Sequence, residues 1–101
     1  MSPAAPRLSA KEALVLDLLC DQPGLYGLQL VEASSGALKR GTVYVTLGRM
    51  EDKGYVLSRV DEDAPEHGGL PRRRYEPTPL GRRLQGALTA LALALRPETA
   101  R

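Results

Sequence analysis

Hydroxyl and cationic side chains recur between residues 39 and 49, and this combination could bind nucleic acid. Such groups form hydrogen bonds with phosphate oxygens and with base edges when a helix lies in a DNA groove. The candidates for DNA contact in this stretch are Lys39, Arg40, Thr42, Tyr44, Thr46 and Arg49. Two other interpretations are open. The Tyr44 ring could pack in the core, and Lys39 with Arg40 could form a solvated basic turn instead of contacting phosphate.

A second basic group follows about twenty residues later, where Arg72, Arg73 and Arg74 are consecutive. Side chains on a strand alternate in direction, so we expect about two of these arginines to face the same partner. At the base of a hairpin they could straddle phosphates or enter a minor groove. The alternative is a solvated surface run.

The elements that must position these residues can be predicted from periodicity. Val43, Leu47 and Met50 form one apolar stripe, which predicts a helix from about Gly41 with Gly54 as its C-terminal cap. The hydroxyls and cations then lie on the side turned away from the core.

Two shorter helical segments precede this helix. Ser9 and Glu12 predict a capping box, and Leu14, Val15, Leu18 and Leu19 recur as one buried face. The second helix is predicted from Gly27 to Ala33.

A hairpin is predicted after Gly54. Tyr55 to Val60 favours a strand, Asp61 to Pro71 has the composition of an acidic loop, and Arg72 to Glu76 favours the return strand. Thr78 and Pro79 then predict the start of a last helix.

The last helix is apolar on all sides between Gly86 and Leu95. A chain of 101 residues has too little remaining sequence to enclose such a helix, so we expect a second copy to cover it. Small residues also recur every four positions, which would allow close helix pairing. The residues expected at this homodimer contact are Leu84, Leu88, Leu91, Leu95, Gly86, Ala90 and Ala94. Arg82 and Arg83, which precede them, are expected to form ion pairs or to remain in solvent.

Composition excludes several classes of function. The 14 basic and 12 acidic residues give a net charge of +2, so the placement of the charges is more informative than their sum. Cys20 is a single cysteine, which excludes an internal disulfide and is expected to be a buried small hydrophobe. His67 lies among Asp61, Asp63 and Glu66, but solvation is the default interpretation over a metal site because no second nitrogen or sulfur ligand is near. No catalytic group or cofactor site is expected, and neither a signal sequence nor a membrane span is predicted, so we expect a cytoplasmic protein.

Four parts of the chain resemble the PadR family of bacterial transcriptional regulators: Leu25-Tyr26-Gly27, Gly41-Thr42-Val43-Tyr44, Leu47 with Met50 to Gly54, and Arg74-Tyr75 through Thr78 to Gly81. The resemblance covers Leu8 to about Leu95. It implies a mainly α fold with a small β-hairpin, in which a winged helix-turn-helix domain (8–78) follows a tail (1–7) and precedes a dimerisation helix (79–96) and a second tail (97–101). A single C-terminal helix resembles the compact subgroup of the family.

The resemblance also implies a function. The expected protein is a homodimeric repressor that binds a palindromic operator, with its third helix in the major groove and its wing on the backbone or minor groove. The chain contains no tryptophan or phenylalanine, which argues against a flat aromatic-ligand sandwich, and any small-molecule effector stays unidentified. The rival hypothesis is a winged-helix protein-interaction module that binds an acidic protein partner.

Overall fold

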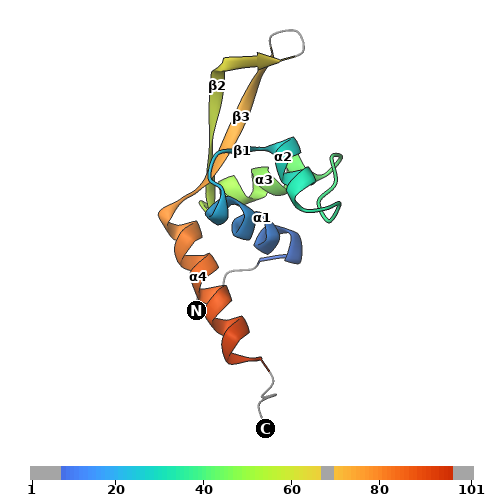
Figure 1. Cartoon of the computed structure of the whole chain (residues 1–101). Coiled ribbons are helices and arrows are strands. Elements are labelled where there is room, and N and C mark those ends of the chain that lie inside the picture. The colour runs from blue at the N-terminus through green and yellow to red at the C-terminus, as the bar shows by residue number, and fades with distance from the viewer. Residues whose placement is uncertain (1–7, 67–69, 97–101) are drawn as a thin grey trace.

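A computed structural model describes residues 8–66 and 70–96, and for residues 62–66, 70 and 71 it describes the backbone alone. The elements are α1 (Ala10–Asp21), β1 (Leu25–Tyr26), α2 (Gly27–Ala33), α3 (Val43–Asp52), β2 (Val56–Glu66), β3 (Leu70–Pro77) and α4 (Pro79–Ala94). Helices α1, α2 and α3 cluster together, the β2–β3 hairpin extends from this cluster, and the end of α4 projects away from it in another direction (Figure 1).

The first and last helices begin at the N-cap residues that the sequence predicts, Ser9 and Thr78. The Ser9 hydroxyl accepts from the Glu12 amide, and the Glu12 carboxylate accepts from the Ser9 amide, at 3.1 and 2.9 Å. Thr78 caps α4 by accepting from the Gly81 amide at 3.0 Å, with Pro79 in the first helical position. These bonds satisfy amides that a helix start otherwise leaves without a partner.

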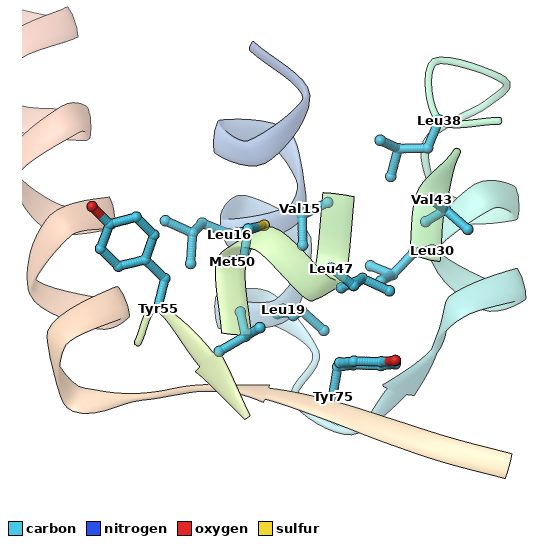
Figure 2. Close-up of a cluster of buried hydrophobic side chains, with 11 residues drawn as sticks. Val15, Leu16, Leu19, Leu30, Leu38, Val43, Leu47, Met50, Tyr55 and Tyr75 are labelled. Atoms are coloured by element: carbon cyan, nitrogen blue, oxygen red, sulfur yellow. The ribbon is translucent and has the colours of Figure 1, made fainter. Parts of the chain in front are cut away.

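The core lies between the three clustered helices and the sheet (Figure 2). Val43, Leu47 and Met50 are fully buried, so the predicted stripe of α3 is confirmed. On α1 the buried face consists of Val15, Leu16 and Leu19, while Leu14 and Leu18 are only partly buried, as is Cys20. The buried face is therefore rotated relative to the predicted one, because Leu16 packs inward.

The sheet has the antiparallel order β1-β3-β2, with Tyr26 opposite Arg74 and Ser58 opposite Tyr75. The acidic stretch predicted as a loop is largely strand: β2 continues to Glu66 and β3 begins at Leu70, with an irregularity between Asp61 and Glu66. The loop was predicted from amino-acid composition alone, and this prediction was wrong. In a hairpin each strand supplies hydrogen-bond partners to the other, so residues with low strand propensity can still be part of a strand. This arrangement, three helices followed by a long hairpin, is a winged helix-turn-helix.

Glu12 and Lys53 connect α1 to the end of α3. The Glu12 side chain is 5% exposed, and the Lys53 ammonium donates to both of its oxygens at 3.0 and 3.2 Å. Burial alone would raise the pKa of Glu12, but the Ser9 amide and Lys53 outweigh it and lower the pKa below its ordinary value of 4.5. The Lys53 ammonium is thus directed to the protein.

This pair predicts a specific loss of stability in acid. A carboxylate with a lowered pKa stabilises the folded state above its unfolded pKa, and that contribution is lost as the pH falls through the lower folded value. We expect Lys53→Met to reduce the free energy of unfolding at neutral pH by about 1–3 kcal/mol, because it leaves the buried carboxylate short of a partner. Urea titrations across pH 2.5–7 (roughly the range in which a carboxylate titrates) measure this. Glu12→Gln, which keeps an oxygen acceptor for the Ser9 amide, should flatten the acid limb, and an unchanged limb would contradict the prediction.

Candidate nucleic-acid interface

The outward face of α3 presents the groups that the sequence assigned to DNA. Thr42, Tyr44 and Arg49 are exposed, and Thr46 is half-buried with its hydroxyl donating to the Thr42 carbonyl at 3.2 Å. Val45 is 56% exposed beside them. Because Val43, Leu47 and Met50 fix the opposite side in the core, this face has a defined direction.

Tyr44 does not pack in the core, since it is 51% exposed. Its ring lies over the backbone of Gly27, the first residue of α2: a Cβ at Gly27 would lie 2.5 Å from Tyr44 Cε1 and 2.8 Å from the hydroxyl oxygen. The absence of a side chain at Gly27 therefore makes room for the ring. The contact explains a glycine at a buried helix start, and it holds the phenol at the edge of the α3 surface.

The basic turn before α3 is fixed by its neighbours. Leu38 is buried, and its amide donates to the Ser34 hydroxyl at 2.9 Å. The Lys39 carbonyl accepts from the Thr42 and Val43 amides at 3.1 and 2.9 Å. Lys39 and Arg40 are exposed. Because these two amides are already bonded, a phosphate at this turn would rely on the basic side chains.

The wing arginines alternate as the sequence predicts, and they have different surroundings. Arg73 Nη1 donates to the Ser58 hydroxyl at 3.0 Å, and Ser58 in turn donates to Glu51 Oε2 on α3 at 2.9 Å. Arg72 and Arg74 lie on the other face of β3. Their guanidinium carbons stand 4.7 and 4.5 Å from the centroid of the Tyr26 ring.

Arg74 is held by further protein groups. Its Nε donates to Asp61 Oδ2 at 2.6 Å and its Nη1 to the Gly24 carbonyl at 3.0 Å. The Tyr26 hydroxyl donates to the same Asp61 oxygen at 2.8 Å, and this hydrogen bond raises the pKa of Tyr26. Asp61 likewise raises the pKa of Arg74. We call Tyr26, Asp61 and Arg74 the wing junction.

The sequence analysis missed Tyr26 as a site residue and placed Asp61 in an acidic loop. The only local signal was the alternation of Arg72 and Arg74 on one strand face. What brings Tyr26 to them is the pairing of β1 with β3, a contact between distant segments.

A shallow groove of about 500 Å³ runs beside this surface. It is lined by Leu28, Gln29, Val31, Glu32, Arg40 and Arg72. The groove is therefore lined by one arginine from the basic turn, one from the wing, and side chains of α2.

The residues expected at a dimer contact divide into two groups. Leu84 packs against the chain's own core, and Leu88 is half-buried. The remainder of the set is exposed: Gly86, Ala90, Leu91, Ala94 and Leu95. Leu91 and Leu95 are 54% and 72% exposed.

The sequence predicts neither a metal site nor a membrane-spanning helix. His67, discussed as a metal ligand, lies outside the described residues, and among residues 8–66 and 70–96 no cluster of ligating side chains is found. Within the same ranges, no helix combines the length and the apolar character needed to cross a membrane.

The comparisons with known proteins agree with this geometry. Residues 15–86 match the family described as transcriptional regulator PadR-like. The chain is similar to a PadR-like transcription factor from Bacteroides fragilis, with 23% identity, a TM-score of 0.70, and coverage of 82% of this chain and 80% of that one. It is also similar to a PadR family transcription regulator from Clostridium difficile R20291, with 26% identity, a TM-score of 0.66, and coverage of 82% and 86%. Streptococcus pneumoniae FabT, solved in complex with DNA, gives 22% identity and a TM-score of 0.71 over 87% of this chain and 57% of FabT. No curated protein sequence matches the chain.

Proposed function

Because the chain belongs to the PadR-like family of transcriptional regulators, we propose that it is a homodimeric repressor that binds a two-fold symmetric operator. The family consists of DNA-binding regulators, not enzymes. The finer role proposed here is steric occupation of a promoter by two copies of the winged helix-turn-helix. Each copy would insert α3 into a major groove, with half-sites about one helical turn apart.

The observation that carries the proposal is the division of α3 into two faces. Its core side is fully buried, while Thr42, Tyr44 and Arg49 are exposed on the other. Arg49 is the proposed base-reading residue, because a guanidinium can bond two acceptors of one guanine. Lys39, Arg40 and Tyr44 are the proposed phosphate contacts beside it. The hydroxyls of Thr42 and Thr46 could bind either a phosphate oxygen or a base edge.

Arg72 and Arg73 are proposed to contact the DNA backbone from the wing. The two side chains point to opposite faces of β3, one toward α2 and one toward α3. Because they lie on opposite faces, we expect each of them to contact a different phosphate. FabT, which shares this fold, has been solved in complex with DNA, and this supports DNA as the partner.

The exposed end of α4 supports the dimer. Leu91, Leu93 and Leu95 are each more than half exposed, so the end of α4 leaves an apolar surface uncovered in the single chain. The neighbouring row of Gly86, Ala90 and Ala94 would let two copies of α4 approach closely.

Selection of binding sites from a pool of random duplexes tests the function directly. We expect enrichment of a palindrome. Arg49→Ala should then reduce discrimination at one base pair by about 1–3 kcal/mol, whereas Arg73→Ala should weaken binding to all sequences and reduce the salt slope by about 0.9. Arg83→Ala removes the same charge from an exposed site on α4 and is the matched control.

Two results would count against the proposal. If Arg49→Ala and Arg73→Ala bound the selected operator like the parent, the assignment of faces would be wrong. If no sequence were enriched even at low salt, the protein-interaction module would be favoured instead.

A further inference from the structure

The wing junction is the strongest unassigned feature of the described molecule. Tyr26 belongs to the β1–α2 corner, whereas Asp61 and Arg74 lie opposite the same corner on β2 and β3. One Asp61 oxygen accepts from both Tyr26 and Arg74, and the Tyr26 ring stacks against the Arg74 guanidinium at 4.5 Å. Three segments that are distant in sequence are therefore bonded at one point.

The wing junction lies where the hairpin joins the rest of the domain, so its bonds can affect the angle of the wing. The hairpin is long, and the β1 segment is joined to it by the pairing of Leu25 with Tyr75 and of Tyr26 with Arg74 and by a bond from the Gly24 amide to the Tyr75 carbonyl. A two-residue strand supplies few backbone hydrogen bonds with which to fix the angle of a long hairpin. The side chains of the junction add a charge-assisted bond, a hydroxyl bond and a cation–π contact at that same anchor.

The contacts of Arg74 indicate that its guanidinium binds protein groups and has a structural role. Its guanidinium is bonded to the Asp61 carboxylate at 2.6 Å and to the Gly24 carbonyl at 3.0 Å. These two bonds hold the guanidinium in place, so a phosphate could use only the N–H donors that they leave. Arg72, two residues away on the same face of β3, has its guanidinium carbon 4.7 Å from the centroid of the Tyr26 ring and lines the groove with Arg40.

We propose that the wing junction is a latch that fixes the angle of the wing, with Arg74 as a positioning residue and Arg72 held by the same ring for contact with phosphate. The effect on DNA affinity rests on the proposed function, but the mechanical effect on the wing does not. Loss of the latch should loosen the hairpin whether or not DNA is present.

Asp61→Asn tests the latch because the charge argument and the positioning argument predict opposite signs. Removing a negative charge from a DNA-binding surface should raise affinity if only electrostatics matters. If Asp61 is part of a latch, the change should instead lower affinity for the selected duplex by about tenfold, as expected for groups that act as one coupled unit. Glu76→Gln is the matched control: it also removes a wing carboxylate, but one whose contact with Arg59 is 3.9 Å long and exposed.

Tyr26→Phe isolates the hydroxyl, because it keeps the stacked ring and removes the bond to Asp61. We expect a smaller loss of affinity than for Asp61→Asn, and little additional loss when the two changes are combined. Circular dichroism confirms that each variant is folded before binding is measured.

Hydrogen exchange supplies the readout that does not need DNA. Amides of β1 and β3 around Tyr26 and Arg74 should exchange about tenfold faster in Asp61→Asn than in the parent or in Glu76→Gln, while core amides of α1 keep their rates. If the parent bound no duplex, the proposed function would fail and the exchange result would still decide the latch. Tighter binding by Asp61→Asn, or exchange unchanged from the parent, overturns the latch.

Discussion

Replacing Leu91 and Leu95 together by lysine is expected to convert the proposed dimer to a folded monomer and to lower its affinity for the full operator by at least about 100-fold. The two side chains are 54% and 72% exposed, so lysine costs the isolated chain little. In a helix-paired dimer the same ammonium groups would have to be buried against a second copy. Each half-site would then be bound independently, without the high effective concentration that a linked second domain provides.

Sedimentation velocity at micromolar concentration measures the change in assembly, and titration of half-site and full-site duplexes measures its effect on binding. The double variant should bind a half-site as the parent does. Leu80→Lys is the control, because Leu80 is similarly exposed at 43% but lies in the first turn of α4 beside the domain. A parent protein that sediments as a well-folded single subunit would disprove the dimer before any variant is made.

The helices of this domain could be predicted from sequence because their signals are local. Ser9 with Glu12 and Thr78 with Pro79 each form a cap from residues within one turn of each other. Gly54, with a positive φ of +81°, likewise lies next to the C-cap residue of α3, Lys53. Such features depend on the backbone next to them, so a pattern of a few letters is enough.

The extent of the wing could not be predicted in the same way. Asp61 to Glu66 contains few β-forming residues, yet it is strand because β3 lies beside it. β-propensity depends strongly on such neighbours, and the sequence does not say which residues will be opposite one another. The same reason hides the wing junction, since Tyr26, Asp61 and Arg74 meet only after β1 has joined the sheet.

The outward side of α3 could be predicted more easily, because burial of one stripe fixes the direction of the other side chains on the helix. Tyr44 shows the limit of this argument. The stripe leaves open whether its ring turns inward, and the answer depends on the space above Gly27, which only the packing of α2 against α3 creates.

Replacing Gly81 by alanine is expected to reduce the free energy of unfolding by about 3 kcal/mol, the upper part of the range for adding a methyl group where no space exists. Gly81 is buried in the first turn of α4, and a Cβ there would overlap the Tyr55 carbonyl oxygen and lie 3.3 Å from Leu16 Cδ2. The carbonyl cannot move away cheaply, because it accepts from the Thr78 amide at 3.0 Å and follows directly from the end of α3. Helix α4 would have to shift as a whole.

Gly48→Ala is the matched control for this prediction, because Gly48 lies within α3 where an added Cβ meets nothing within 4 Å. There alanine should stabilise the protein by about 0.5–1 kcal/mol through its higher helix propensity. Urea unfolding of both variants in the absence of DNA measures the difference. If Gly81→Ala were as stable as the parent, the close approach of α4 to Tyr55 would be wrong, and with it the direction in which α4 leaves the domain to meet a second copy.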